Sequence, residues 1–308
     1  MMLHVLLLTV GFVFLVKGAD WFVEGAAGIA KKLGIPQLVI GLTIVAMGTS
    51  MPEAAVSITS ALSGSAGISI GNVVGSNILN ILIILGITAV LTNVRIQKTT
   101  FRYEIPFMIG ITIILMAFGI TGNQITFLEG ILFWLLFLIF LGYLFVISKK
   151  GSVQDEEEIK ELPLWKGVLG IIIGGILVVK GSDFAVEGAT EIARYFGMSE
   201  RFIGLTIVAF GTSLPELVTS VTAARRGNAD IAIGNIVGSN IFNILFVIGT
   251  TALICNVPFD QKFVIDTIVA IFSGVLLWAG TICYKELRKN CGIVMLLCYA
   301  GYFIYLCK

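Results

Sequence analysis

The chain contains a gapless internal repeat. Residues 34–86 recur at 197–249, so every position is shifted by 163, and roughly 31 of the pairs are identical. The first copy reads GLTIVAMGTSMPE and then GNVVGSNILNIL; the second reads GLTIVAFGTSLPE and then GNIVGSNIFNIL. Glu53 therefore pairs with Glu216, and Asn80 with Asn243. Such a duplicated polar pattern within apolar sequence predicts two related units that share one site.

Composition places most of the chain in a lipid bilayer. Apolar residues make up 57% and charged residues 13%, with a mean hydropathy of +1.01, whereas about a quarter of a soluble domain is charged. A membrane helix needs about 20 mainly apolar residues. The sequence predicts ten such segments, at residues 2–29, 36–62, 67–92, 101–121, 125–148, 164–192, 199–224, 229–255, 262–283 and 291–307.

The distribution of basic residues predicts the orientation. If the N-terminus lies outside the cell, 14 lysines and arginines fall in cytoplasmic loops and four on the outer side, as positive-inside topology requires. Both termini are then extracytoplasmic, in a multi-pass protein of the cell membrane. Five helices per repeat is an odd number, so the two repeats must be inverted. We expect an all-α membrane protein with a first repeat at 1–150, a cytoplasmic linker at 151–163 and a second repeat at 164–308.

Other polar and reactive features favour structural roles. The N-terminal apolar run lacks a basic leader and continues to Ala30, which indicates a retained first helix rather than a signal peptide. The acidic run Asp155–Glu158 lacks the ligand spacing of an EF-hand loop, which favours a solvated connector over a Ca²⁺ sensor. Packing is the expected role of the cysteines, which have no CxxC spacing: Cys255, Cys283, Cys291, Cys298 and Cys307.

A charged triplet recurs on the first and sixth segments. Lys17, Asp20 and Glu24 return as Lys180, Asp183 and Glu187, and their spacing of three and four puts each triplet on one helical face. Lys17 is expected to pair with Asp20. Interfacial anchoring by snorkelling side chains is the favoured interpretation, and a gate or sliding contact is the alternative.

Within the repeats, polar residues four apart share a helical face. Thr49 is thereby associated with Glu53 and Ser76 with Asn80, and the second copy repeats this with Thr212 and Glu216, and with Ser239 and Asn243. Pro52 and Pro215 interrupt helical hydrogen bonding and release carbonyls near Gly48 and Gly211. We therefore predict broken helices at the second, third, seventh and eighth segments. Unwound backbone at membrane depth is tolerated where it lines an ion-binding cavity.

The ligand set predicts a hard cation. Two glutamates, two asparagine amides, hydroxyls and free carbonyls form an all-oxygen site of charge −2, which suits Ca²⁺; zinc or copper would need imidazole or thiolate. A glutamate at the bilayer centre costs roughly 2.5 kcal/mol or more without a partner. The alternative, protonated glutamates that only hold helices together, does not explain why the whole pattern is duplicated.

Among functions, this arrangement favours a secondary transporter over an enzyme or a channel. An intramembrane hydrolase would need a second catalytic group beside a glutamate, and the sequence offers none. A passive channel could use a ring of carboxylates, but two sets of broken helices without a repeated pore loop favour alternating access. We expect no enzymatic activity, no cofactor and no nucleic-acid partner.

At GTSMPE with GSNILN, and at GTSLPE with GSNIFN, the chain resembles the cation/Ca²⁺ exchanger superfamily. Within it, the resemblance is to the Na⁺/Ca²⁺ exchanger family, especially its compact prokaryotic members. It implies ten helices, four clustered ion positions, and first and sixth helices that slide together. It also implies the ligands Glu53, Glu216, Asn80, Thr49, Ser50, Ser76, Thr212, Ser213 and Ser239, with backbone oxygens of Ala46 and Ala209.

One position departs from that family pattern. Several relatives, K⁺-dependent exchangers among them, have an aspartate where this chain has Asn243. The site charge therefore stays at −2, and K⁺ co-transport is not expected. The proton-coupled branch usually has an asparagine-containing motif in place of GTS, which favours Na⁺ over H⁺ as the driving ion. The expected function is electrogenic Na⁺/Ca²⁺ antiport, with Ca²⁺/H⁺ antiport as the alternative. The ions and membrane lipid are the expected partners; the sequence identifies no protein partner, and a monomer can act alone.

Overall fold

The computed structural model describes residues 1–150, 162–198, 209–282 and 285–306. The first half of the chain is helical apart from two short strands. Its elements are α1 (Met2–Leu33), α2 (Gln37–Ile40), the π-helical segment η1 (Gly41–Val45), α3 (Ala46–Thr49), α4 (Met51–Leu62), α5 (Gly67–Leu79), the π-helical segment η2 (Asn80–Leu85), α6 (Gly86–Leu91), β1 (Val94–Arg95), the π-helical segment η3 (Thr100–Glu104), α7 (Ile105–Gly122), β2 (Gln124–Ile125) and α8 (Phe127–Lys150).

The second half repeats this order. Its described elements are α9 (Leu164–Tyr195), α11 (Ala209–Gly211), α12 (Leu214–Arg225), α13 (Ala229–Phe242), the π-helical segment η5 (Asn243–Ile248), α14 (Gly249–Ile254), β3 (Val257–Pro258), α15 (Lys262–Gly280), β4 (Glu286–Leu287) and α16 (Lys289–Leu306).

The helix count agrees with the predicted ten segments. Eight described helices are long and apolar enough to cross a membrane, and the bent second segment makes nine. Helices α11 and α12 belong to the predicted seventh segment, whose beginning lies outside the described residues. The acidic run of the linker, Cys283 and Cys307 also lie outside the description; the three described cysteines are free thiols.

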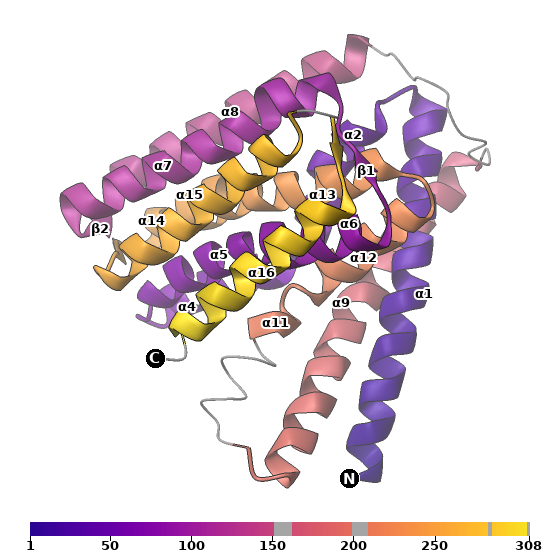
Figure 1. Cartoon of the computed structure of the whole chain (residues 1–308), viewed down its shortest axis with the longest axis horizontal. Coiled ribbons are helices and arrows are strands. Elements are labelled where there is room, and N and C mark those ends of the chain that lie inside the picture. The colour runs from indigo at the N-terminus through magenta and orange to yellow at the C-terminus, as the bar shows by residue number, and fades with distance from the viewer. Residues whose placement is uncertain (151–161, 199–208, 283–284, 307–308) are drawn as a thin grey trace.

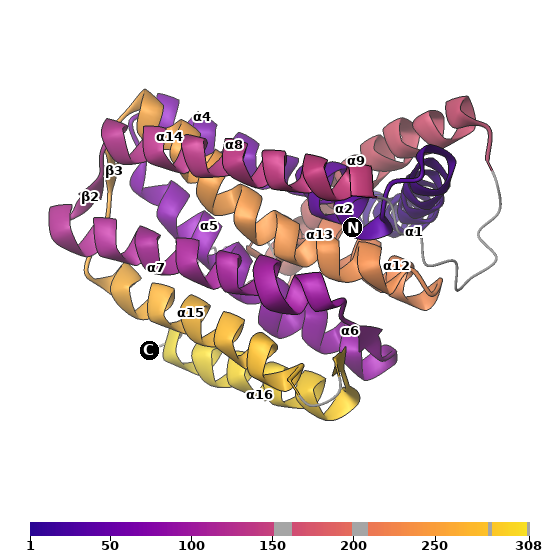
Figure 2. The ribbon, with the colours of Figure 1, turned by 90° about the horizontal axis from the view of Figure 1, so that it is seen from above.

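Helices α1 and α9 form a long pair at one side of the bundle (Figures 1 and 2). Three glycines spaced by seven place backbone against backbone: an added Cβ on Gly11 would meet Ala185 N at 2.6 Å, on Gly18 Val178 N at 2.8 Å, and on Gly25 the carbonyl of Gly167 at 2.6 Å. The residue numbers of the contacting positions on α9 decrease as those on α1 increase, so the two helices are antiparallel. Small residues allow this close approach in lipid.

Because α1 and α9 are equivalent helices of the two repeats, their antiparallel packing means that the repeats are inverted. The strands agree. Antiparallel β1 pairs with β4, through Val94 and Leu287, and β2 pairs with β3, through Ile125 and Val257. Each small sheet thus takes one strand from each repeat, and the two sheets are related by exchange of the repeats.

Repeated glycines end the equivalent helices. Gly34 after α1 and Gly197 after α9 have φ of 64° and 75°, a left-handed conformation that favours glycine. The next residue closes the helix in each copy: Ile35 N donates to Ala30 O at 2.9 Å, and Met198 N to Ala193 O at 3.1 Å. The chain can then turn into the broken helix that follows.

The predicted helix breaks are present in the second and seventh segments, whereas the third and eighth are continuous helices. The second segment bends by 49° between Thr49 and Met51, and the seventh is interrupted at Thr212 and Ser213. Pro52 and Pro215 lie in the first turn of the new helices, α4 and α12, where no backbone donor is lost. The third and eighth segments continue through their irregular region, which is π-helical from Asn80 and Asn243 onward.

The charged triplets make different contacts in the two repeats. Lys180 pairs with Asp183 on α9 at 3.1 Å. On α1, the partner of Asp20 and Glu24 is Arg226, directly after α12, at 2.8 and 3.4 Å. The predicted Lys17–Asp20 pair is therefore replaced by a pair with Arg226, which is distant in sequence and is brought to Asp20 by the packing of α12 on α1.

Candidate functional site

The polar residues of both repeats meet where the breaks of the second and seventh segments approach the middles of the third and eighth. Helix α13 packs on η1 and α3, and α12 on α13 and η2. The GTS-x-PE and GSN-x-x-N motifs thereby converge from four segments. Both glutamates are buried, with Glu53 1% and Glu216 0% exposed.

Glu216 is held by residues of the first repeat. Ser50 Oγ, at the break between α3 and α4, donates to Glu216 Oε1 at 2.7 Å. Thr49 Oγ1 lies 3.0 Å from Asn235 Oδ1, and Asn235 Nδ2 donates to the backbone carbonyl of Glu216 at 3.4 Å. Ser239 Oγ donates to Ala46 O at 3.3 Å. These contacts join the second segment directly to the seventh and eighth.

Glu53 has the equivalent position in the first repeat, with fewer contacts. Thr212, Ser213 and the Glu216 carboxylate lie beside it, but both Glu53 carboxylate oxygens and Ser213 Oγ lack a hydrogen-bond partner among the described residues. The pseudo-symmetric environments therefore differ: Ser50 bonds to Glu216, whereas Ser213 does not complete the corresponding bond to Glu53.

Each of the two site asparagines donates a hydrogen bond to an asparagine of the other repeat. Asn80 Nδ2 donates to Asn240 Oδ1 at 2.9 Å, and Asn243 Nδ2 donates to Asn77 Oδ1 at 3.1 Å. Asn80 is 1% and Asn243 0% exposed. Their own Oδ1 atoms are buried without a partner. Both amides therefore present an oxygen, and not a nitrogen, as the free atom.

The free oxygens suit a hard cation. Within the described chain, Glu53 Oε1 and Oε2, Glu216 Oε2, Asn80 Oδ1, Asn243 Oδ1 and Ser213 Oγ are buried and unpaired. Such orphaned acceptors cost free energy unless something positive binds them. Among the described residues, no group of three or more histidine, cysteine, aspartate or glutamate side chains could hold a metal ion. The donors at this site are two carboxylates together with uncharged amide and hydroxyl oxygens. Ca²⁺ accepts such a set of oxygen ligands.

The remaining predicted ligands lie nearby on the same elements. Ser76 is buried one turn before Asn80 on α5. Ala46 begins α3 and Ala209 begins α11, each just before its helix break. The Gly211 carbonyl at the second break is engaged, because Ser182 of α9 donates to it at 2.7 Å.

Sequence reasoning missed a second set of polar residues behind the ligands. Asn72 Nδ2 donates to the Glu53 backbone carbonyl at 3.1 Å and to Ser57 Oγ at 2.9 Å. Asn235 makes the same pair of contacts with Glu216 and Ser220. The signal was present, because Asn72 and Asn235 are also repeat-equivalent. Helical spacing, however, relates each asparagine only to neighbours on its own helix.

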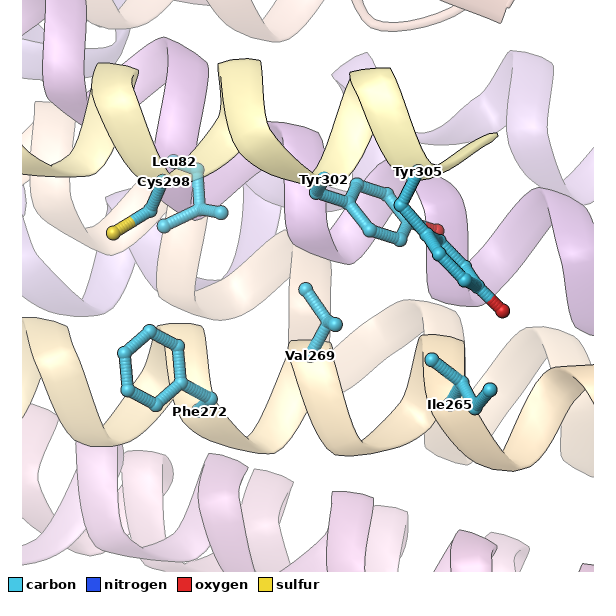
Figure 3. Close-up of a pocket in the computed structure, with 7 residues that line it drawn as sticks. All are labelled: Leu82, Ile265, Val269, Phe272, Cys298, Tyr302 and Tyr305. Atoms are coloured by element: carbon cyan, nitrogen blue, oxygen red, sulfur yellow. The ribbon is translucent and has the colours of Figure 1, made fainter. Parts of the chain in front are cut away.

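An apolar surface cavity lies away from these residues. It measures about 270 Å³ and lies between α15 and α16, with Leu82 of η2 beside Cys298 in its lining (Figure 3). Its other lining residues are Ile265, Val269, Phe272, Cys298, Tyr302 and Tyr305. An apolar lining without convergent carboxylates does not suit a metal ion, so this cavity is not the candidate site.

Family comparison agrees with the site. A family model described as "Sodium/calcium exchanger protein" matches residues 3–146 and 166–308, which is most of the chain. The chain belongs to the sodium/calcium exchanger family. This confirms the resemblance found in the motifs, and it makes the protein a multi-pass membrane transporter and not an enzyme.

Individual relatives of this exchanger-family chain align along nearly their whole length. The sodium/calcium exchanger MaX1 of Methanosarcina acetivorans is 32% identical, with 98% of this chain and 97% of the relative covered. The inner membrane protein YrbG of Escherichia coli is 36% identical, with 90% of each covered.

A solved structure has the same fold. The sodium-calcium exchanger NCX_Mj, soaked with 2.5 mM Na⁺ and 1 mM Sr²⁺, superposes with a TM-score of 0.86 and 33% identity, covering 99% of this chain and 98% of that one. This exchanger-family chain therefore has the same fold as NCX_Mj, which in this chain consists of two inverted, mainly helical repeats.

Proposed function

We propose that the protein is a secondary antiporter that exchanges Na⁺ for Ca²⁺ across the cell membrane by alternating access. The observation that carries the proposal is the pair of buried glutamates, Glu53 and Glu216, surrounded by unpaired oxygens from both repeats. A charge of −2 at membrane depth, with no basic partner among the described residues, requires cations. One Ca²⁺ neutralises the pair.

The proposed ligands are the residues predicted from the sequence. Side-chain oxygens come from Glu53, Glu216, Asn80, Asn243, Thr49, Ser50, Ser76, Thr212, Ser213 and Ser239, and backbone oxygens from Ala46 and Ala209. The burial of both glutamates and both asparagines supports the assignment, as do the hydrogen bonds that Ser50, Ser239 and Asn80 make to the other repeat. Dehydrated Ca²⁺ takes six to eight oxygens, and this set is large enough to hold it or several Na⁺ in turn.

Alternating access follows from the arrangement of α1 and α9. These two helices pack on each other through close backbone contacts, and each also touches a broken segment: α1 contacts α12, and α9 contacts α3 and α11. Moving them as one unit would uncover one side of the site while covering the other. Two inverted repeats around a central site are the usual basis of such exchange.

The coupling is proposed to be electrogenic, driven by Na⁺ and independent of K⁺. Asn243 leaves the site with two carboxylates, so binding of more than two Na⁺ gives a net positive charge that Ca²⁺ does not. Each net charge moved is worth about 2.3 kcal/mol per 100 mV of membrane potential. We further propose that both termini are extracytoplasmic and that the monomer is competent. The proposed units are residues 1–150, 151–163 and 164–308.

Purified protein in liposomes tests the coupling ion. Vesicles loaded with Na⁺ should take up Ca²⁺, whereas matched vesicles loaded with K⁺, or given only a pH gradient, should not. A valinomycin-imposed potential in K⁺-containing vesicles, inside positive or negative, should change the initial rate of Na⁺-driven uptake if charge moves. Equal uptake with the pH gradient alone would favour Ca²⁺/H⁺ antiport, and a rate unaffected by voltage would mean two Na⁺ per Ca²⁺.

A further inference from the structure

Four buried asparagine amides form a closed network behind the proposed ion site. Asn77 and Asn80 lie three residues apart at the end of α5 and the start of η2, and Asn240 and Asn243 occupy the same places in the second repeat. All four are at most 4% exposed. Asn77 and Asn240 are not among the proposed ligands.

Backbone carbonyls set the direction of the network. Asn77 Nδ2 donates to the Asn240 carbonyl, and Asn240 Nδ2 to the Asn77 carbonyl, both at 3.2 Å. A carbonyl can only accept, so each contact must be made by an amide nitrogen. The side-chain oxygens of Asn77 and Asn240 are then obliged to point the other way.

The orientation of the Asn77 and Asn240 amides then determines that of the Asn80 and Asn243 amides at the site. Asn240 Oδ1 can only accept, so it must face the nitrogen of Asn80, at 2.9 Å. Asn77 Oδ1 likewise faces the nitrogen of Asn243, at 3.1 Å. The Oδ1 atoms of Asn80 and Asn243 are the atoms that remain, and both are buried and unpaired. The orientation of each ligand amide is thus determined by the opposite repeat.

Local helix geometry makes the carbonyls available. The π-helical segments begin at Asn80 and Asn243, directly after the turn that carries the accepting carbonyls of Asn77 and Asn240. The carbonyls of Asn77 and Asn240 also accept the backbone N–H of Asn80 and Asn243. A carbonyl oxygen has two lone pairs, so each can accept an amide from the other repeat as well. The same irregularity occurs in both copies, so the network is symmetric.

We propose that Asn77 and Asn240 are positioning residues that orient the amides of Asn243 and Asn80, respectively, with oxygen toward the bound cation. The inference deepens the proposed function and rests on it. Without the acceptor on Asn240, the Asn80 amide is free to rotate and place its nitrogen, the positive end of the amide dipole, toward the ion. The loss then appears as weaker ion binding.

Equilibrium Ca²⁺ binding to purified protein in Na⁺-free buffer tests the inference. Asn240→Leu and Asn77→Leu keep the side-chain size and remove the amide. Each should weaken Ca²⁺ affinity by about 10- to 100-fold, the usual effect of removing a group that orients a metal ligand. Thr251→Val is the matched control: Thr251 is fully buried and its hydroxyl donates to Val247 O of its own helix at 2.8 Å. The Ca²⁺ affinity of Thr251→Val should equal that of the parent protein.

Crossed double variants distinguish orientation from general packing. In an Asn80→Ala background, Asn240→Leu should cost less than a further twofold, because the amide that it orients is gone. Asn77→Leu, which acts on Asn243, should keep its full effect there. If the leucine variants do not fold, as judged by size-exclusion profile and melting temperature, the alanine variants remove the same amides without branched bulk.

The outcomes separate this inference from the proposed function. Affinity within twofold of the parent in both single variants overturns the inference, as does a full multiplicative loss for Asn240→Leu combined with Asn80→Ala. Failure of the parent to bind Ca²⁺ or to take it up against Na⁺ would instead overturn the proposed function.

Discussion

At the scale of single residues, the two glutamates dominate the proposed chemistry. Glu53 and Glu216 are both buried, and Ser50 Oγ donates a hydrogen bond to Glu216 Oε1 at 2.7 Å. Two buried carboxylates close enough to interact repel each other and have lost their hydration, so a shared Ca²⁺ stabilises both. Each charge should therefore be indispensable.

Replacing either glutamate by glutamine tests this requirement. Glu53→Gln or Glu216→Gln keeps the side-chain size and removes one charge, and each should lower Na⁺-driven Ca²⁺ uptake at least 100-fold while the protein still inserts and folds. Glu104→Gln is the control, because Glu104 is also 1% exposed but accepts a hydrogen bond from the Tyr143 hydroxyl and is not a proposed ligand. Near-normal uptake by either site variant would refute the site assignment.

Asn243 determines how many charges the site carries. Asn243→Asp adds a third carboxylate near Glu53 and Glu216, and like charges at this separation favour uptake of a proton or of another cation. Ca²⁺ flux should therefore depend more strongly on pH than in the parent when measured from about pH 6 to 9, a range that brackets protonation of a crowded carboxylate. Asn123→Asp adds the same charge at an exposed turn and should leave the profile unchanged. Superimposable profiles for the site variant and parent, with no extra ion bound, would show that Asn243 does not face the cavity.

At the scale of elements, the α1–α9 pair depends on glycine. Gly11, Gly18 and Gly25 lie seven residues apart on α1 and meet backbone atoms of α9 at distances below 3 Å from an added Cβ. Real side chains do not reach such distances. The two helices therefore have no room for even a methyl group, and this favours their moving as one body.

Gly18→Ala tests the tight contact. Its methyl group would meet Leu177 Cβ and Val178 N at 2.8 Å, so the helices must separate, at a cost of about 1–3 kcal/mol as for other overpacked sites. The melting temperature in detergent should fall. Gly142→Ala on α8 has open space around the new methyl group and should not lower it. Equal melting temperatures for the two variants would mean that the α1–α9 contact is looser than the structure has it.

At the scale of the whole molecule, the ion pairs that hold the first helix of each repeat differ between α1 and α9. Arg226 connects the end of α12 to Asp20 and Glu24 of α1. The equivalent acids, Asp183 and Glu187, are present on α9, but the residue equivalent to Arg226 is Ser63. The ion-pair clamp of Arg226 therefore holds α1 in this conformation. The equivalent position in the first repeat has no basic side chain that could hold α9 in the oppositely facing conformation of an alternating-access cycle.

Arg226→Gln should loosen this clamp. The pairs are partly exposed, with side chains 32–44% accessible, so together they contribute about 1 kcal/mol at most, equivalent to about a fivefold change in a conformational equilibrium. Hydrogen exchange in nanodiscs should rise in residues 20–33 and 222–228. Lys180→Gln removes an ion pair that lies within α9 alone, so it should not raise hydrogen exchange in residues 20–33 and 222–228. Unchanged exchange in Arg226→Gln would show that the clamp does not hold α1.

The sequence by itself determined the class of fold and the kind of site. Hydropathy, the odd number of segments in each repeat and the copied GTS-x-PE and GSN-x-x-N motifs can be read directly from the sequence, so they predict membrane helices, inverted repeats and a shared oxygen site without coordinates. Only tertiary structure decided the partners. Asn80 and Asn240 are 160 residues apart, and Arg226 is 206 residues from Asp20. Helical spacing relates a residue to its own helix, whereas these hydrogen bonds and ion pairs depend on how helices of opposite repeats pack against one another.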